Sequence, residues 1–232
     1  MVLVASYNIR KAIGSDRRRR PDRILEVLCE IDADIVTLQE ADRRFGNRES
    51  ALPLHMIVEH SPYMPVPFDV RAGSLGWHGN AVLVRRTATV LAQSTIVLPA
   101  LEPRGAVMAD IRVGGVDLRV VGMHLDLSGL WRRRQAHAIL AGIAGEGAPL
   151  PTVMMGDLNE WRAAGGCLHD FAQHFRFAET GPSFHARRPV ARLDRIIVSQ
   201  NLRVTACGVH RSAGARTASD HLPVWAKLAV AE

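Results

Sequence analysis

Cysteine and aromatic residues are scarce in this sequence of 232 residues, and each shortage excludes a class of protein. The three cysteines (Cys29, Cys167 and Cys207) are odd in number and form no CxxC pair, so we expect neither a disulfide framework nor a structural zinc site. Aromatic residues make up only 5% of the chain, which leaves few platforms for stacking the bases of a single-stranded nucleic acid. Few cysteines also fit a reducing compartment, and a cytoplasmic location is the expectation.

Long apolar runs are also missing. No run reaches the roughly 18 residues of a membrane span, so we expect no transmembrane segment. The first residues lack the basic lead and cleavage site of a signal peptide. Without internal repeats or low-complexity linkers, and with 47% hydrophobic and 22% charged residues, the sequence predicts one globular domain over residues 1–232.

Lysine is nearly absent, because 27 of the 29 basic side chains are arginine. The net charge of +6 favours anionic partners such as nucleic acid, small phosphates or an acidic membrane surface. Genomic compositional bias also produces such an arginine excess, so charge alone does not choose among these partners.

The order of predicted elements indicates a layered α/β fold. Pro21 suits the first turn of a helix over 21–31. A second helix is predicted over 130–143, with Leu130 and Ile139 facing inward and residues 132–134 facing at least partly outward. Residues 43–75 are rich in Pro, Gly and His and predict an irregular loop. Strands are predicted at 2–7, 34–38, 80–84, 88–98, 106–113, 116–123, 152–155, 193–199, 202–209 and 222–230, with a tight turn at 114–115.

Polar residues follow or interrupt six of the apolar runs. Burying such groups without partners costs several kcal/mol each, so their repeated placement at strand ends indicates a site. Glu40, Asp157 and Asp220 offer the oxygen ligands that Mg²⁺ or Mn²⁺ prefers, and His124 and His221 are suited to proton transfer. The complete set is Asn8; Glu40; His124 with Asp126; Asp157 with Asn159; Asp194; and Asp220 with His221.

Taken singly, each of these residues has an ordinary structural explanation. Asn8 suits a turn, Asp157 with Asn159 suits an Asx turn or helix cap, and Asp194 suits an ion pair with a neighbouring arginine. A histidine at a strand end is more often a satisfied core residue than a catalyst. The ordered combination is what favours a functional site.

Seven strings carry a resemblance that covers residues 6–224: SYNIR, LQE, GNAVL, GMHLD, GDLN, RLDRIIVS and SDHLPV. Together they resemble the endonuclease/exonuclease/phosphatase superfamily, which includes DNase I-like nucleases, apurinic endonucleases, neutral sphingomyelinases and inositol polyphosphate 5-phosphatases. The resemblance implies a DNase I-like four-layer α/β sandwich, in which two mixed β-sheets pack face to face with helices outside. It also implies Mg²⁺-dependent (or Mn²⁺-dependent) hydrolysis of a phosphoester.

The resemblance also implies a role for each matched residue. It places Asn8, Glu40 and Asp220 at the metal. Asp157 and Asn159 handle the attacking water and the phosphate, and Asp194 orients His221. His124 matches a histidine that DNase I-like members direct towards the leaving group. Apurinic endonucleases place a tyrosine near that position, so the resemblance to them is weaker.

The substrate is left open by the sequence. The first hypothesis is a phospholipid headgroup or another small phosphodiester or phosphomonoester, because 232 residues leave little room for insertions that grip duplex DNA. The alternatives are a DNA endonuclease or exonuclease and a non-catalytic relative that only binds phosphate ligands. Arginine runs at 17–20 and at 43, 44 and 48 would follow a nucleic-acid backbone or an acidic membrane, although such runs are usually solvated. The candidate substrate-binding residues are Asn80, Asp126, Arg17, Arg18 and Trp131.

Overall fold

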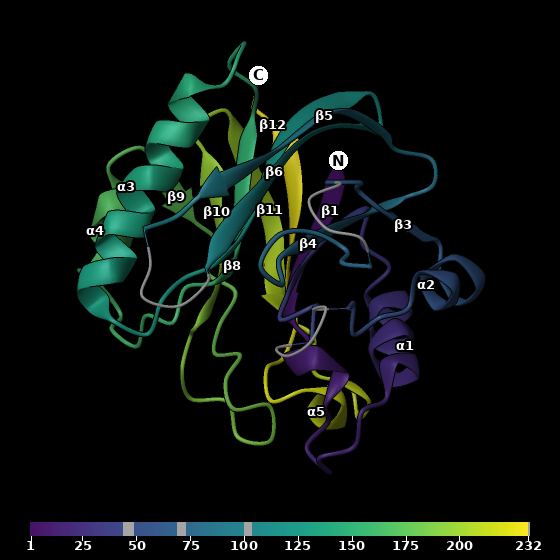
Figure 1. Cartoon of the computed structure of the whole chain (residues 1–232). Coiled ribbons are helices and arrows are strands. Elements are labelled where there is room, and N and C mark those ends of the chain that lie inside the picture. Colours follow the sequence, from purple (N-terminus) through teal and green to yellow (C-terminus); the bar gives the residue numbers. More distant parts are fainter. Residues whose placement is uncertain (44–48, 69–72, 100–103, 232) are drawn as a thin grey trace.

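The computed structural model describes residues 1–43, 49–68, 73–99 and 104–231, in which two six-stranded sheets form the centre (Figure 1). The strand order of the first sheet is β11-β12-β1-β2-β4-β3, and that of the second is β5-β6-β7-β8-β10-β9. In chain order the strands are β1 (Val2–Asn8), β2 (Ile35–Gln39), β3 (Tyr63–Pro65), β4 (Ala81–Arg85), β5 (Thr89–Val97), β6 (Gly105–Val113), β7 (Val116–His124), β8 (Thr152–Asp157), β9 (Phe175–Phe177), β10 (Asp194–Ser199), β11 (Leu202–Val209) and β12 (Val224–Val230).

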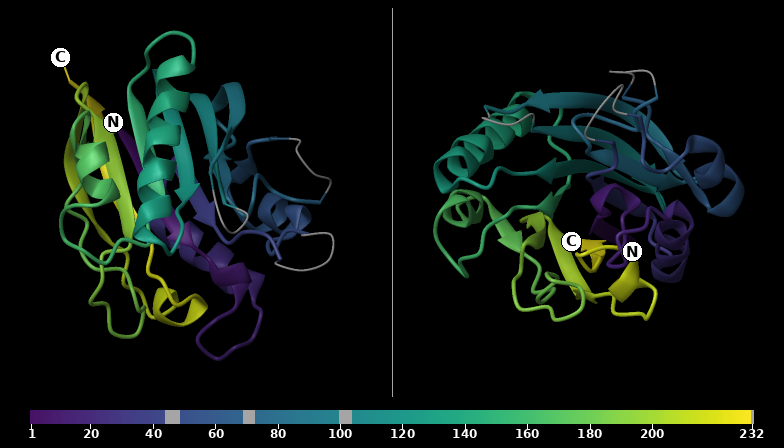
Figure 2. Two further views of the ribbon diagram at one scale, coloured as in Figure 1. Left: turned by 60° about the vertical axis from the view of Figure 1, so that its left-hand side comes forward. Right: turned by 60° about the horizontal axis from the view of Figure 1, so that its bottom comes forward.

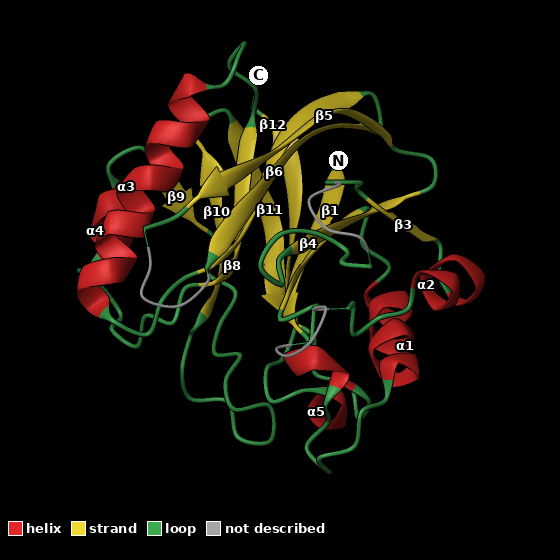
Figure 3. Cartoon of the chain, viewed as in Figure 1, coloured by secondary structure: helices red, strands yellow, loops and turns green. Residues whose placement is uncertain are grey.

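The helices lie outside the two sheets, which gives four layers (Figures 2 and 3). Helices α1 (Pro21–Ile31), α2 (Leu54–His60) and α5 (Ala215–Ala218) are on the side of the first sheet, and α3 (Gly129–Gly145) and α4 (Cys167–Ala172) cover the second. A short 3-10 helix, η1 (Arg10–Ala12), follows β1. The predicted DNase I-like sandwich is confirmed. None of the helices in the described part of the chain is both long and apolar enough to cross a membrane.

Three apolar clusters fill the spaces between these layers. Along β1, Val2 and Val4 point into the space between the sheets, whereas Ala5 and Tyr7 point towards α1. Successive strand residues face opposite sides, so a strand covered on both faces is apolar at almost every position. This explains why the strands of the sequence are continuous apolar runs.

The two sheets come close together where β7 passes β2. Gly122 of β7 has no side chain, and a Cβ atom built there would lie 3.2 Å from the Thr37 methyl of β2 and 3.1 Å from a Val107 methyl. Such distances are tighter than ordinary van der Waals contact, so glycine at this position permits the observed separation of the sheets.

Most element predictions are confirmed to within a residue or two, but the loop predicted over 43–75 is partly wrong. It contains α2 and β3, while residues 44–48 and 69–72 lie outside the described residues. In α2 only Ile57 is fully buried, so this two-turn helix carries almost no apolar periodicity. The short elements α4, β9 and α5 were also not predicted. The turn at Gly114 and Gly115 is confirmed, and both residues have positive φ.

The orientation predicted for α3 is wrong at two positions. Leu130 is 60% exposed, whereas Arg132 is buried. The Arg132 guanidinium donates to the Glu160 carboxylate at 2.9 Å and to the Leu127 carbonyl at 2.6 Å, so its charge and donors are satisfied in the interior. A buried arginine with complete partners is indistinguishable in sequence from a solvent-facing one.

Candidate active site

The ends of three adjacent strands bring His124, Asp157 and Asp194 together. His124 pairs with Asp157 across the parallel β7–β8 ladder, and Asp194 pairs with Asp157 across the antiparallel β8–β10 ladder. All three side chains are buried. The Nε2 atom of His124 lies 3.5 Å from the Asp157 carboxylate. The close β7–β8 approach requires Gly156, since a Cβ there would collide with the Met123 carbonyl at 1.8 Å.

His221 reaches the same carboxylate from the loop before β12. Its Nδ1 is 2.8 Å from Asp194 Oδ2, and its Nε2 is 3.7 Å from Asp157 Oδ2. Asp194 also accepts a hydrogen bond from the Ser183 hydroxyl at 2.5 Å. Asp194 and Ser183 therefore hold the His221 ring with its second nitrogen directed at Asp157.

Asn8 links the two sheets at this point. It ends β1, and its side-chain Nδ2 donates to Asp157 Oδ2 at 3.0 Å. On one side Asn8 pairs with Gln39 across β1–β2, so Glu40 is the next residue along. On the other side the Ser219 hydroxyl donates to the Asn8 carbonyl at 2.7 Å, which places Asp220 next to Asn8. Glu40 and Asp220 thus flank the same strand end.

Arg10 and Lys11 lie against these two carboxylates. The Arg10 guanidinium is 3.2 Å from Asp220 Oδ2, and the Lys11 ammonium contacts Glu40 Oε2. Arg10 and Lys11 have positive φ values of 46° and 58°, a conformation that L-residues adopt rarely and that is concentrated at functional sites. Glu40 and Asn159 share this feature, with φ values of 52° and 50°.

Three side chains near the end of β1 are of the kind that binds a divalent cation. Asn8, Glu40 and Asp220 offer amide and carboxylate oxygens, the ligand class that Mg²⁺ and Mn²⁺ prefer. A second possible ligand group in the described part of the chain is formed by Asp157, Asp194 and His221, whose potential ligand atoms lie within 4.8 Å of one another. In that group Asp194 and His221 already share a 2.8 Å hydrogen bond, so we interpret the group as a proton-transfer arrangement.

The pKa values of His124 and His221 are shifted in opposite directions. Burial lowers the pKa of His124 to about 3, an effect opposed by Asp157 and reinforced by Arg104. Burial also acts to lower the pKa of His221, but the charges of Asp194, Asp157 and Asp220 outweigh it and raise the pKa to about 10. At neutral pH His124 is therefore uncharged, which does not favour its predicted role in protonating the leaving group.

The predicted substrate-binding residues lie in several environments. Asn80 is buried and donates to the Gly105 carbonyl at 2.8 Å, a structural contact. Asp126 accepts from the Ser128 backbone N–H at 2.8 Å. Arg17 and Arg18 are exposed in the loop before α1, and the Trp131 ring lies on α3 with the Arg134 guanidinium 4.9 Å above it. Arg43 pairs with Glu49, while Arg44 and Arg48 lie outside the described residues.

Several residues at the site were missed in the sequence. Besides Arg10, Lys11 and Ser183, the structure brings in Trp161 and Phe184, which form an aromatic row with the predicted His221. The Trp161 and Phe184 ring centroids are 5.8 Å apart, those of Phe184 and His221 are 4.8 Å apart, and Trp161 is 64% exposed. Trp161 follows Asn159 by two positions, so its closeness to the GDLN string was a signal that could have been used.

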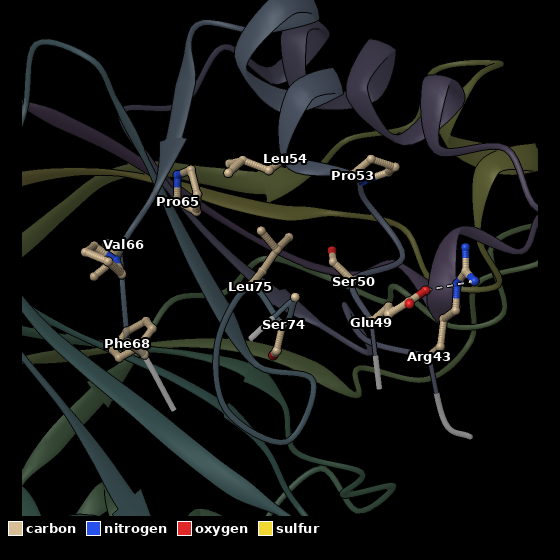
Figure 4. A pocket seen from close by; sticks show the side chains of 12 residues that line it. Arg43, Glu49, Ser50, Pro53, Leu54, Pro65, Val66, Phe68, Ser74 and Leu75 are labelled. Carbon is tan, nitrogen blue, oxygen red and sulfur yellow. Dashed lines mark hydrogen bonds and ion pairs between the residues drawn. The ribbon is translucent and has the colours of Figure 1, made fainter. Parts of the chain in front are cut away.

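A separate cavity of about 640 Å³ lies next to α2 and β3 (Figure 4). None of the predicted catalytic or metal-binding residues lines it. Its walls are mainly apolar, with the Arg43–Glu49 ion pair at one end. The residues lining it are Arg43, Glu49, Ser50, Pro53, Leu54, Pro65, Val66, Pro67, Phe68, Gly73, Ser74 and Leu75.

The fold and the strand-end site agree with a comparison against known families. The model of the endonuclease/exonuclease/phosphatase family matches residues 5–221, so the chain belongs to this family, as the motif resemblance predicted. Family membership supports a phosphoesterase or nuclease activity. No relative among the curated proteins matches the sequence.

Solved structures of the same fold cover nearly the whole chain. A mannosyl-6-phosphatase from Bacteroides thetaiotaomicron shares 22% identity, covers 99% of this chain and 100% of its own, and superimposes with a TM-score of 0.77. For the human Nocturnin catalytic domain the identity is 20%, the coverage 99% and 94%, and the TM-score 0.74. For D. rerio TDP2 with a single-strand DNA product the identity is 16%, the coverage 99% of both chains, and the TM-score 0.74. At these identities the comparison establishes the fold.

Proposed function

We propose that this protein hydrolyses a phosphodiester or phosphomonoester bond with the help of Mg²⁺ or Mn²⁺, by in-line attack of an activated water. The observation that carries the proposal is the convergence on Asp157 of nitrogen atoms from Asn8, His124 and His221, at 3.0, 3.5 and 3.7 Å. Three separate chain segments surround one buried carboxylate, an arrangement that structural stability does not require.

In this proposal Asp157 orients the water and accepts its proton. Asn8 Nδ2 and the Asn159 backbone N–H donate to the two oxygens of Asp157, which fixes the direction of the carboxylate. His221 donates a hydrogen bond to a phosphoryl oxygen, and Asp194 fixes its orientation through Nδ1. Positioning and charge neutralisation supply most of the catalysis, since an anionic phosphodiester repels an incoming nucleophile.

Asn8, Glu40 and Asp220 would hold the divalent cation. The cation, when bound, neutralises charge on the phosphoryl group. Arg10 and Lys11 lie against the Asp220 and Glu40 carboxylates and balance part of their charge.

The aromatic row beside His221 favours a substrate that carries an organic group on the phosphate. Trp161 presents an exposed ring two residues from Asn159, and exposed rings at a site contact flat or apolar groups through stacking. We therefore take a small phosphodiester with an organic substituent as the first candidate substrate. DNA endonuclease or exonuclease activity is the second candidate, supported by the exposed Arg162 next to Trp161 and by the exposed Arg17 and Arg18.

A substrate panel tests the proposal. Purified protein would be incubated with Mg²⁺ or Mn²⁺ and bis-p-nitrophenyl phosphate, p-nitrophenyl phosphate, inositol phosphates, phospholipids, and plain or abasic DNA. Metal-dependent release of alcohol or phosphate from one class supports the proposal, and no turnover of any member contradicts it. Salt separates the two candidates, because nucleic-acid binding weakens steeply with ionic strength.

A further inference from the structure

Arg104 contacts the nitrogen of His124 that faces away from Asp157. A terminal nitrogen of its guanidinium lies 2.9 Å from His124 Nδ1, whereas His124 Nε2 lies 3.5 Å from Asp157 Oδ2. The contact follows from the β6–β7 hairpin: Ala106 pairs with Met123, so the residues just before β6 lie beside the end of β7.

The chemistry of arginine settles which atom donates. A guanidinium has five N–H donors and no acceptor, so His124 Nδ1 must accept the hydrogen bond with its lone pair. A neutral imidazole carries its single proton on the other nitrogen, which here is Nε2. We propose that Arg104 is a positioning residue that locks His124 in the Nε2–H tautomer and aims this N–H into the site, towards Asp157 and the reacting phosphate.

The charge of Arg104 adds to this geometry. A second proton on His124 would have to sit on Nδ1, directly against the guanidinium. Burial, together with the nearby positive charge of Arg104, holds the pKa of His124 far below its usual value. A carboxylate in the place of Arg104 would act oppositely, because it would accept from Nδ1–H and leave Nε2 as the bare acceptor. The charge of the side chain at position 104 therefore decides whether His124 Nε2 is a hydrogen-bond donor or an acceptor in the site.

The role that follows rests on the proposed phosphoester hydrolysis. In this role the uncharged His124 ring donates a hydrogen bond to a phosphoryl or leaving-group oxygen. It does not transfer a proton to that oxygen. Replacing Arg104 by alanine should lower kcat about 10- to 100-fold, the usual effect of losing a residue that orients a site histidine, with a much smaller change in KM.

Imidazole ¹⁵N NMR tests the tautomer directly and without substrate. In protein labelled at histidine, the signal of His124 is assigned by its loss in His124→Gln. We expect an unprotonated Nδ1 and a protonated Nε2 in the wild type, and averaging between tautomers in Arg104→Ala. Arg104→Lys, which retains a cationic donor, should preserve part of the wild-type pattern. An Nδ1–H tautomer in the wild type, or an Arg104→Ala spectrum identical to it, overturns the proposal.

A double-mutant cycle gives the second readout. Once His124 is replaced by Gln, adding Arg104→Ala should cost little more activity, whereas independent roles would make the losses multiply. Arg112→Ala is the matched control, because Arg112 lies near the other end of β6 and pairs with Asp117 on the exposed surface. Full activity of folded Arg104→Ala contradicts the positioning role. The expected tautomer without any phosphoester turnover would instead contradict the proposed function alone.

Discussion

Asp157 and Asp194 face each other across the β8–β10 ladder, and both carboxylates lie within reach of the His221 ring, at 3.7 and 2.8 Å. The register of two strands thus sets the spacing of two acids, and a histidine from a third segment lies between them. Asp194 is fully buried and holds the ring, whereas Asp157 also meets Asn8 and His124. Asp157 is thus the carboxylate on which the largest number of these side chains converge.

Asp157→Asn should lose at least about 100-fold in kcat while folding normally, because the nearly isosteric amide can no longer accept a proton. Turnover of the best substrate and the thermal unfolding midpoint would be measured together. Asp117→Asn is the control, since Asp117 lies at the opposite end of the β6–β7 hairpin and pairs with Arg112. A folded Asp157→Asn variant with wild-type activity would remove Asp157 from the mechanism.

Removal of divalent cations by EDTA should abolish turnover, and Mg²⁺ or Mn²⁺ should restore it. Glu40→Gln should require a higher Mg²⁺ concentration, since a neutral amide is a weaker ligand than a carboxylate. Isothermal titration calorimetry with Mn²⁺ measures this independently of activity. Unchanged Mn²⁺ affinity in Glu40→Gln would show that Glu40 is not a ligand, and EDTA-resistant turnover would exclude the cation.

Trp161→Ala should raise KM about tenfold for a phosphodiester that carries an aromatic ring, the effect of losing one stacking contact. The kcat value should change little, because Trp161 does not touch Asp157 or its direct partners. A dialkyl phosphodiester is the internal control and should show no such change. Equal effects on both substrates would indicate that Trp161 supports the loop and not the ring.

Arg132→Ala should destabilise the fold by about 3–5 kcal/mol, because Glu160 would be left as an unpaired buried charge. Urea unfolding monitored by circular dichroism measures this. Arg134, two residues further along α3, is exposed and lies over the Trp131 ring, so Arg134→Ala should cost at most about 1 kcal/mol. Similar losses in both variants would contradict the structural importance of the Arg132–Glu160 pair.

The ion pair between Asp170 and Arg133 should make stability depend on pH. Hydrogen bonds and charge from Arg133 hold the pKa of the Asp170 carboxyl below its ordinary value. A carboxylate of this kind stabilises the folded protein above its unfolded pKa, and the contribution is lost as pH falls through the folded pKa. The stability difference between wild type and Asp170→Asn should therefore be largest at neutral pH and shrink below about pH 4.

A cycle with Arg133→Ala checks that prediction. Asp170→Asn and Arg133→Ala should not be additive at pH 7, because each removes the same interaction. If the losses in unfolding free energy were additive, or if the stability difference did not vary with pH, the lowered pKa of Asp170 would have another cause.

Sequence reasoning reached the sandwich and the polar strand ends because both leave direct traces. Strands buried on two faces are continuous apolar runs, and His124, Asp157 and Asp194 interrupt or end such runs. The short elements left no trace, since α2 buries only Ile57 fully and β9 spans three residues. Arg132 was misjudged because its partner Glu160 is 28 residues away and no local pattern links them.

The residues that support the site were the hardest to find. Arg104 begins no motif and reaches His124 only through the β6–β7 hairpin, and Ser183 reaches Asp194 through a loop that the sequence leaves without any regular pattern. Arg10 and Lys11 were visible beside Asn8, but their pairing with Asp220 and Glu40 requires the three-dimensional fold. Local sequence thus pointed to the polar residues at the strand ends, whereas most of the side chains that contact them became visible only in the fold.

The absence of a side chain at Gly122, next to Thr37, has a consequence for the spacing of the two sheets. Asn8 belongs to one sheet and Asp157 to the other. The distance between the two packed sheets therefore determines whether these side chains can form their 3.0 Å contact. A methyl group added at Gly122 would lie 3.1 Å from a Val107 methyl and 3.2 Å from the Thr37 methyl, so these side chains would have to move by a few tenths of an ångström. Packing at a position remote from the strand-end site thus bears on the geometry of that site.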